Sequence, residues 1–201
     1  MTVEGVVEAY SAVAELYIER IGRLDAVPTE DPPVIARHLA GLDGPVLDVG
    51  CGPGHLTAFL HEAGADVTGI DPVPAFLAHA RTAHPGVAFE AGSFAALARP
   101  DASVAGVLAW FSLIHTPPGE VDAALAELRR VLRPGGVIVV GFFSWDVCEP
   151  FPHKVVTAYR WPVDELSARL ASAGFAELER AVRMPSGEHR PYAVHVARAV
   201  R

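Results

Sequence analysis

The chain has 201 residues, of which 51% are hydrophobic and 20% charged, and its formal net charge is −8. This composition excludes intrinsic disorder, and the length suits one domain that buries roughly 70% of the surface of its unfolded chain. No apolar run reaches the ~20 residues that cross a bilayer. Residues 1–17 carry Glu4 and Glu8 and no lysine or arginine, so we expect no signal peptide. The 16 basic residues, of which only Lys154 is a lysine, form no basic stripe of the kind that binds nucleic acid. We therefore expect a cytoplasmic protein without membrane or nucleic-acid partners.

The predicted elements alternate between short β-rich runs and helical patterns, which indicates an α/β domain. The first 40 residues have helical apolar spacing, so we expect an N-terminal helical cap over residues 1–40. Two apolar runs, residues 45–50 and 137–143, are typical of central parallel strands covered on both faces. The other predicted strands are 66–71, 87–91, 104–110, 176–184 and 192–200, and the predicted helices are 55–63, 74–83, 119–132 and 162–173.

The C-terminal part of the chain departs from the simple alternation. Residues 144–161 are rich in aromatic residues and proline, and we interpret them as a loop or short irregular insert. The last two strands are joined by residues 185–191 and must pair antiparallel, because a parallel connection needs a dozen or more residues. We predict one domain over 1–201: a doubly wound, Rossmann-like, seven-stranded and mostly parallel sheet with an antiparallel C-terminal edge hairpin. Its ligand crevice should lie at the carboxyl ends of the central strands.

A glycine-rich turn, Asp48-Val49-Gly50-Cys51-Gly52-Pro53-Gly54, joins the first central strand to the next helix. Glycines in such a turn let the backbone approach a ligand closely. The dinucleotide fingerprint G-x-G-x-x-G would place its third glycine at residue 55, which is His55, and this disfavours a nicotinamide oxidoreductase. Pro53 removes a backbone donor that a pyrophosphate would use, and no Gly-Lys-Ser/Thr follows as in a Walker loop.

The run from Val46 to Gly54 resembles the first motif of the class I S-adenosylmethionine (SAM)-dependent methyltransferases, and the resemblance extends over about residues 40–200. Asp71, at the end of the second strand, resembles the family's acidic residue that binds the ribose hydroxyls. Ala91-Gly92-Ser93-Phe94 resembles the segment beside the adenine, with Ser93 where the family usually has Asp. Further segments that resemble the family are 109–115 after the fourth strand, 128–136 before the fifth, and 164–175 in the late helix.

The resemblance implies an enzyme that transfers the methyl group of SAM to a small-molecule acceptor and releases S-adenosylhomocysteine. It makes His115 the candidate base, since imidazole titrates near neutral pH, and it implies a substrate lid over residues 144–161. The implied acceptor contacts are His115, Trp145, Tyr159 and Arg160, and the implied cofactor contacts are Tyr17, Asp48, Gly50, Cys51, Gly52, Gly54, Asp71, Pro72, Ser93, Phe94, Trp110 and Phe111.

Several alternatives stay open at this point. Three candidate residues could instead be purely structural. Asp48 could accept backbone N–H bonds within the loop, Ser93 could cap a turn, and His115 could be a half-buried, hydrogen-bonded histidine. The chain could bind SAM without net methyl transfer, or it could be a non-catalytic methyltransferase-like module. No metal is expected, because Trp110 and Phe111 end the fourth strand where a metal-assisted enzyme has an acidic residue. The acceptor atom and the oligomeric state, a homodimer included, are undetermined.

Overall fold

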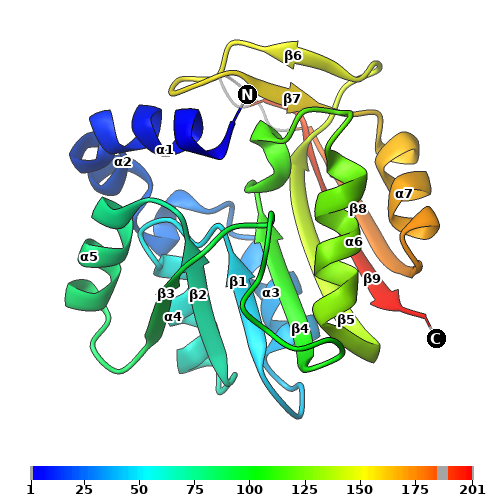
Figure 1. The fold of residues 1–201 in the computed structure, drawn as a ribbon, viewed down its shortest axis with the longest axis horizontal. Helices are drawn as coiled ribbons and strands as arrows, with labels where there is room; N and C mark the ends of the chain where they lie inside the picture. The colour runs from blue at the N-terminus through cyan, green and yellow to red at the C-terminus, as the bar shows by residue number, and fades with distance from the viewer. Residues whose placement is uncertain (1, 185–189, 201) are drawn as a thin grey trace.

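The computed structural model describes residues 2–184 and 190–200, which form a seven-stranded main sheet with helices on both of its faces and a separate two-stranded sheet (Figure 1). The connection 185–189 of the predicted edge hairpin lies outside the described residues. In the described part, no helix is long and apolar enough to cross a membrane. The helical elements are α1 (Val3–Ala12), α2 (Ala14–Ile21), η1 (Leu24–Ala26), α3 (Asp31–Leu39), α4 (His55–Glu62), α5 (Pro74–Ala83), η2 (Leu113–His115), α6 (Val121–Val131) and α7 (Val163–Ser172).

The main sheet has seven strands in the order β3-β2-β1-β4-β5-β9-β8. The first five are parallel, and β9 pairs antiparallel with both β5 and β8. This arrangement confirms the predicted doubly wound sheet with an antiparallel edge hairpin. Strand order reverses between β1 and β4, so the crevice lies at their carboxyl ends. The strands are β1 (Val46–Val49), β2 (Val67–Asp71), β3 (Ala88–Ala91), β4 (Val104–Trp110), β5 (Leu132–Phe143), β8 (Phe175–Arg183) and β9 (Tyr192–Ala199).

The core is divided by the sheet into two layers. Leu47 and Val49 of β1 pack with the α6 and α7 side chains, including Leu125 and Leu166, whereas Val46 packs with the α3 and α4 side chains. All four residues of β1 are buried. Burial on both faces explains why this strand reads as a continuous apolar run, and each such side chain contributes about 1.5–3 kcal/mol.

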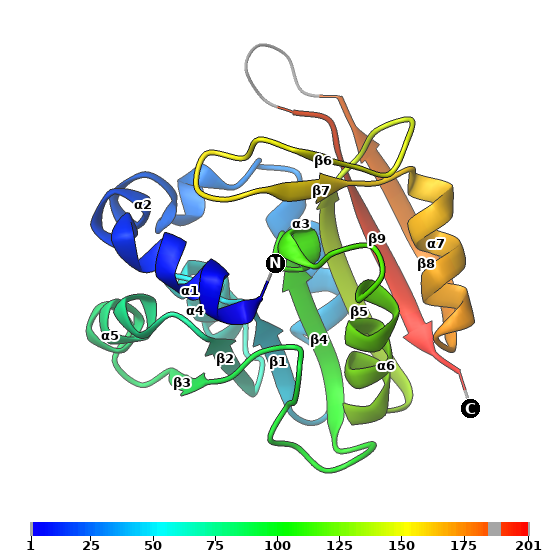
Figure 2. The ribbon, with the colours of Figure 1, turned by 45° about the horizontal axis from the view of Figure 1, so that its top comes forward.

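The aromatic insert is more regular than the sequence predicts. It forms a two-stranded antiparallel sheet of β6 (Glu149–Phe151) and β7 (Ala158–Arg160) instead of an irregular loop. Each strand has only three residues and β6 contains a proline, so neither carries a recognisable period-2 pattern. The hairpin crosses the carboxyl ends of β4 and β5 (Figure 2), which brings residues 144–161 over the predicted crevice.

The predicted break between α6 and β5 is also placed differently. β5 begins at Leu132 rather than at residue 137, because Leu132 pairs with Val104 and the register shifts between Val104 and Gly106. Gly135 has a positive φ of 81° within this irregular stretch. The Pro134-Gly135-Gly136 sequence therefore bends the start of the strand instead of lying wholly outside it.

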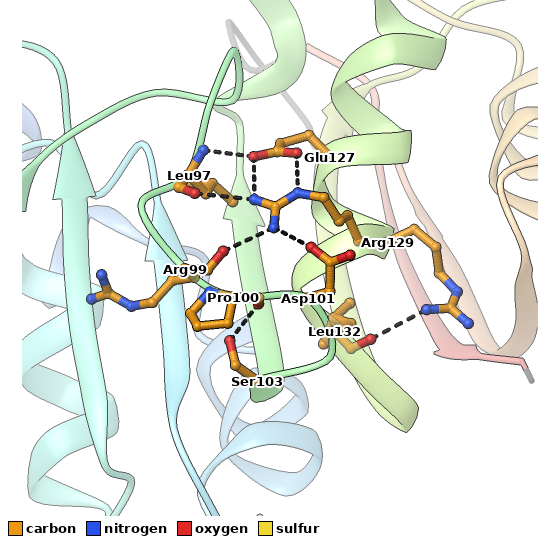
Figure 3. A network of polar contacts seen from close by, with 9 residues as sticks. Leu97, Arg99, Pro100, Asp101, Ser103, Glu127, Arg129 and Leu132 are labelled. Carbon is orange, nitrogen blue, oxygen red and sulfur yellow. Dashed lines mark hydrogen bonds and ion pairs between the residues drawn. The ribbon is translucent and has the colours of Figure 1, made fainter.

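A dense polar network at the amino end of β4 fixes α6 to the segment 97–103. The Arg130 guanidinium donates five hydrogen bonds: to both oxygens of Glu127 at 2.7 Å, to Asp101 at 2.7 Å, and to the carbonyls of Arg99 at 2.8 Å and Leu97 at 3.0 Å. The backbone N–H of Leu97 donates to Glu127 at 2.6 Å, and the Ser103 hydroxyl donates to the Pro100 carbonyl at 2.7 Å (Figure 3). Hydrogen bonds from Arg130 lower the pKa of Glu127.

Candidate active site

The three glycines of the turn after β1 have positive φ angles, and the packing around them differs. A Cβ at Gly50 would lie 2.2 Å from the Ser112 Cβ, and a Cβ at Gly54 would lie 2.8 Å from the Phe89 ring. A Cβ at Gly52 would meet no atom within 4 Å, although Gly52 is buried. Protein packing therefore requires the first and third glycines, whereas the second borders enclosed free space at the crevice.

Asp71 ends β2 beside this free space. It is 5% exposed, and its two carboxylate oxygens accept the backbone N–H groups of Gly52 and Val73, each at 2.8 Å. Burial raises the pKa of Asp71 to about 6, and the two backbone hydrogen bonds oppose that rise. Each oxygen keeps a second lone pair, so the carboxylate can still accept hydrogen bonds from a diol. Pro72 lies in the half-buried turn that follows.

The side chains of Asp48 and Cys51 point into the protein. Asp48 is 1% exposed and accepts a 2.7 Å hydrogen bond from the Thr57 hydroxyl, which links β1 to α4. Burial raises the pKa of Asp48 to about 7. Cys51 packs with Leu77 and Phe89, and burial raises the pKa of its thiol. A ligand in the crevice would therefore meet the backbone of the turn at Cys51, and a cofactor contact of either side chain stays a prediction.

An aromatic cluster from the N-terminal helices covers the Asp71 side of the crevice. The Tyr17 ring centroid lies 5.3 Å from that of Tyr10 and 5.2 Å from that of Phe76. Burial, together with the negative charge of Asp71, raises the pKa of Tyr17 to about 12. The structure thus brings Tyr17 close to Asp71, at the place where the sequence predicts a cofactor contact.

The chain turns sharply at the carboxyl end of β4. Phe111 has a φ of 50°, which is rare for a residue other than glycine, and its N–H donates to the Gly141 carbonyl at 3.0 Å. Its ring packs against Trp110, Phe143 and Tyr192 at 5.3, 4.9 and 5.6 Å, so Trp110 and Phe111 form a wall with β5 and β9. Strained backbone of this kind concentrates at functional sites.

Sequence reasoning missed Ser112, the next residue. Its hydroxyl oxygen is buried and has no hydrogen-bond partner among the residues that the structure describes. The Ser112 side chain abuts Gly50, which makes it part of the crevice wall. Its position in the sequence could have indicated a role in the site, because Ser112 directly follows two aromatic residues at the end of a central strand. Ligands of such sheets bind at the carboxyl ends of the strands.

Both ring nitrogens of His115 have protein partners. Nδ1 lies 2.9 Å from the Thr157 carbonyl, which can only accept, so Nδ1 carries the proton and Nε2 accepts from the Tyr10 hydroxyl at 2.8 Å. Burial lowers the pKa of His115 and keeps the ring neutral. Its hydrogen bonds connect α1, η2 and the residue before β7. The helical apolar spacing of residues 1–40 gives no indication of the bond from Tyr10, which only the fold brings beside His115.

The predicted lid residues Trp145, Tyr159 and Arg160 make contacts with other protein side chains. Trp145 is 42% exposed and lies under the Arg160 guanidinium, 4.0 Å from the ring centroid, while Arg160 also pairs with Glu149 at 2.5 Å. Tyr159 packs against the core cluster on the α6 and α7 side. The contacts of these three side chains lie within the hairpin and the core, and their contact with an acceptor remains a prediction.

The segment predicted to border an adenine forms a local turn. The Ser93 hydroxyl accepts the Ala95 N–H at 3.3 Å, and Phe94 packs against the same core cluster as Tyr159. Hollows of about 520 and 280 Å³ lie away from the crevice, beside α3 and α4, and both include Phe59 in their walls. Within the described ranges, no group of three or more His, Cys, Asp and Glu side chains could hold a metal ion.

Comparison with known families and proteins agrees with this geometry. Residues 46–136 match the family described as a methyltransferase domain. The malonyl-[acyl-carrier protein] O-methyltransferase of Erwinia billingiae (strain Eb661) is 31% identical over 143 residues, 71% of this chain and 55% of that protein. The demethylmenaquinone methyltransferase of Beutenbergia cavernae is 37% identical over 106 residues, 53% of this chain and 43% of that protein. The chain spans about half the length of the curated relatives it matches.

Solved structures share the fold over nearly the whole chain. The 1,6-didemethyltoxoflavin-N1-methyltransferase of Burkholderia thailandensis, crystallised with 1,6-didemethyltoxoflavin and S-adenosylhomocysteine, has a TM-score of 0.79 at 23% identity, covering 98% of this chain and 87% of that one. The [4+2]-cyclase SpnF has a TM-score of 0.81 at 19% identity, covering 97% of this chain and 95% of that one. At these identities the likeness concerns the fold.

Proposed function

Since the chain belongs to the class I SAM-dependent methyltransferases, we propose that it binds SAM at the carboxyl ends of β1, β2 and β4 and transfers the methyl group to a small-molecule acceptor. One observation carries the proposal: buried Gly52 donates its N–H to Asp71, and its missing side chain leaves enclosed space beside that carboxylate. A turn and a carboxylate so arranged fit a nucleoside, with the diol at Asp71 and the backbone of residues 50–54 along the rest of the ligand.

SAM would supply a methyl group that is already activated by its bond to a positively charged sulfur. The protein itself has to bind the cofactor and the acceptor, exclude water and orient the acceptor toward the methyl group. Asp71 would hold the ribose, Tyr17 and Phe76 would cover it, and the aromatic wall of Trp110 and Phe111 suits a sulfonium cation through the ring quadrupole. The small-molecule acceptor is supported by the acidic charge balance of the chain.

Calorimetric titration with S-adenosylhomocysteine tests the cofactor. We expect the wild type to bind, and Asp71→Ala to bind 10-fold to 100-fold more weakly, because two hydrogen bonds of about 0.5–1.5 kcal/mol each are lost. Asp122→Asn is the control, because Asp122 pairs with Arg169 on the exposed surface of α6. Thermal unfolding shows whether each variant is folded. Failure of the folded wild type to bind would contradict the proposal and favour the non-catalytic module.

Product analysis tests the reaction. Methyl transfer converts one SAM to S-adenosylhomocysteine for each acceptor consumed, so the two amounts should rise together. Acceptor turnover with no loss of SAM would instead support the alternative in which bound SAM is not a methyl donor.

A further inference from the structure

We propose that His153, in the connection between β6 and β7, binds the methyl acceptor and takes its proton, and that the acceptor is a planar conjugated molecule with an acidic hydroxyl or ring N–H. This inference rests on the proposed function and names the substrate class for the same site. It moves the role of the base from His115, where the sequence predicts it, to a neighbouring histidine on the lid.

His153 packs in a cluster of aromatic rings. Its ring centroid is 5.5 Å from that of His115, 5.9 Å from that of Phe143 and 6.3 Å from that of Phe151. Phe111 continues this wall, 4.9 Å from Phe143. These residues come from the carboxyl ends of β4 and β5, from η2 and from the hairpin, so the cluster lies at the edge of the sheet where the proposed function places the acceptor. Flat ring faces on several sides favour a planar, conjugated molecule.

The Nδ1 atom of His153 has no hydrogen-bond partner within this cluster. It is buried and makes no hydrogen bond within residues 2–184 and 190–200. Buried polar atoms in native proteins nearly always have a partner, and an exception calls for a ligand, a water or a functional role. A hydroxyl or N–H on the acceptor would supply the missing hydrogen bond.

His115 is less suited to receive a proton. Its Nδ1 donates to Thr157 and its Nε2 accepts from Tyr10, so the protein already uses both nitrogens. Protonation at Nε2 would reverse this hydrogen bond, so that the Tyr10 hydroxyl would have to turn and accept. The role of His115 is to position α1 and the hairpin beside the aromatic cluster, whereas Nδ1 of His153 has no partner in the described structure and can accept when it carries the lone pair.

The charges near His153 define the acceptor further. Burial lowers its pKa to about 4, and His115, Arg190 and Lys154 contribute in the same direction. Arg190 stacks on Phe151 at 4.6 Å and donates to the Pro152 carbonyl at 3.3 Å. A weak base can deprotonate only an acidic group, and two nearby cations stabilise the anion that results. Both effects point to an acidic hydroxyl or ring N–H, and they disfavour a cationic amine.

The step balances in atoms and charge. The O–H or N–H bond of the acceptor breaks and its proton binds Nδ1 of His153. The electron pair left on oxygen or nitrogen forms the bond to the methyl carbon, the carbon–sulfur bond breaks, and its electrons stay on sulfur. The sulfonium charge of SAM is thus replaced by the charge of the imidazolium, which then releases its proton to water.

The probe is 4-nitrophenol, an acidic planar phenol whose anion is yellow. We add it to protein saturated with S-adenosylhomocysteine, at a pH below the pKa of the free phenol. We expect the wild type to bind it as the yellow anion, because Arg190 and Lys154 stabilise the phenolate and the adjacent phenolate in turn favours the protonated form of His153. His153→Phe keeps the ring but not the nitrogens, and it should lose the colour change and bind at least 10-fold more weakly. His61→Phe, an exposed position on α4, is the matched control and should behave as wild type.

Three results would overturn the inference. One is a colour change of wild-type size in His153→Phe; another is wild-type binding of 4-nitroanisole, which has no acidic proton, as tight as that of 4-nitrophenol. The third is no binding of 4-nitrophenol to the loaded wild type. S-adenosylhomocysteine is titrated first into each variant, so a failure of the cofactor proposal is seen separately. Equal affinity for it in wild type and His153→Phe shows that the variant is folded.

Discussion

The two ends of β4 differ in whether the polar groups around them have hydrogen-bond partners. At the amino end, all five N–H donors of Arg130 are used, and the hydroxyl of Ser103 has a partner. At the carboxyl end, Ser112 and His153 keep buried polar atoms without partners among the described residues, and Asp71 has a raised pKa. One end satisfies its polar groups and holds α6 in place, and the other keeps hydrogen-bonding capacity for a ligand. Changes at the two ends should therefore separate stability from binding.

Arg130→Met should show the largest difference between its effect on stability and its effect on ligand affinity. Methionine keeps the apolar stem of Arg130 but removes all five hydrogen bonds and leaves Glu127 without its charge partner. We expect the free energy of unfolding, as measured by urea denaturation, to fall because five hydrogen bonds are lost together. Affinity for S-adenosylhomocysteine should stay within about two-fold of wild type at a temperature where the variant is folded. A large loss of affinity would mean that the two ends are coupled.

The raised pKa of Asp48 predicts a pH-dependent effect at the carboxyl end. A carboxyl group with a higher pKa in the folded state binds protons more tightly there, so its contribution to stability falls as pH rises from about 4 to its folded pKa of about 7. Asp48→Asn removes the titrating carboxyl group and with it this pH-dependent contribution to stability. The unfolding free energy of wild type relative to Asp48→Asn should therefore drop by about 2–3 kcal/mol between pH 4 and pH 7. A difference that is constant with pH would show that Asp48 is not protonated more easily on folding.

Two glycines allow the free space beside the turn to be tested directly. Gly52 and Gly64 both have positive φ angles, 54° and 96°, and a Cβ at either would meet no atom within 4 Å. Alanine should cost about 1–2 kcal/mol of stability at each, through backbone strain. Calorimetry with S-adenosylhomocysteine should show at least a 10-fold loss for Gly52→Ala and none for Gly64→Ala, which lies at the end of α4. Equal affinities would place the ligand elsewhere.

The smallest expected effect comes from the two serines that flank β4. Ser103→Ala removes a hydrogen bond and should cost about 0.5–1.5 kcal/mol, whereas Ser112→Ala removes an unpartnered buried hydroxyl and should be neutral or stabilising. Only Ser112→Ala should weaken S-adenosylhomocysteine binding, by a few fold. Thermal unfolding and calorimetry on the same preparations measure both quantities. Destabilisation by Ser112→Ala would contradict the contrast between the two ends.

The sequence predicts the parts of this fold that depend on local pattern. α5 has the predicted bounds, because Pro74 suits a first helical turn and the apolar spacing continues to Ala83. β4 also matches, as an uninterrupted apolar run over 104–110. The hairpin of β6 and β7 was not predicted as strands, because a strand of three residues is too short to show alternating apolar and polar residues.

The site is predictable only in part, for a related reason. Positive φ angles and a carboxylate at a strand end are encoded within a few residues, so Gly52 and Asp71 could be found from spacing. Whether a polar atom has a partner depends on distant segments. The difference between His115, which is held by Tyr10 and Thr157, and His153, whose Nδ1 has no partner in the described structure, therefore appears only after folding.

The hydrogen bonds of His115 join segments that the ribosome makes at widely separated times. Tyr10 precedes His115 by 105 residues, and Thr157 follows it by 42. At about 5–20 residues per second, the ribosome needs several seconds to tens of seconds to make that length of chain. Tyr10 is made before His115 and lacks this hydrogen-bond partner for most of the interval, although Phe76, which packs on both Tyr10 and Tyr17, is made earlier than His115. A pause in translation before residue 157 would lengthen the period in which a chaperone or a protease can reach this helix.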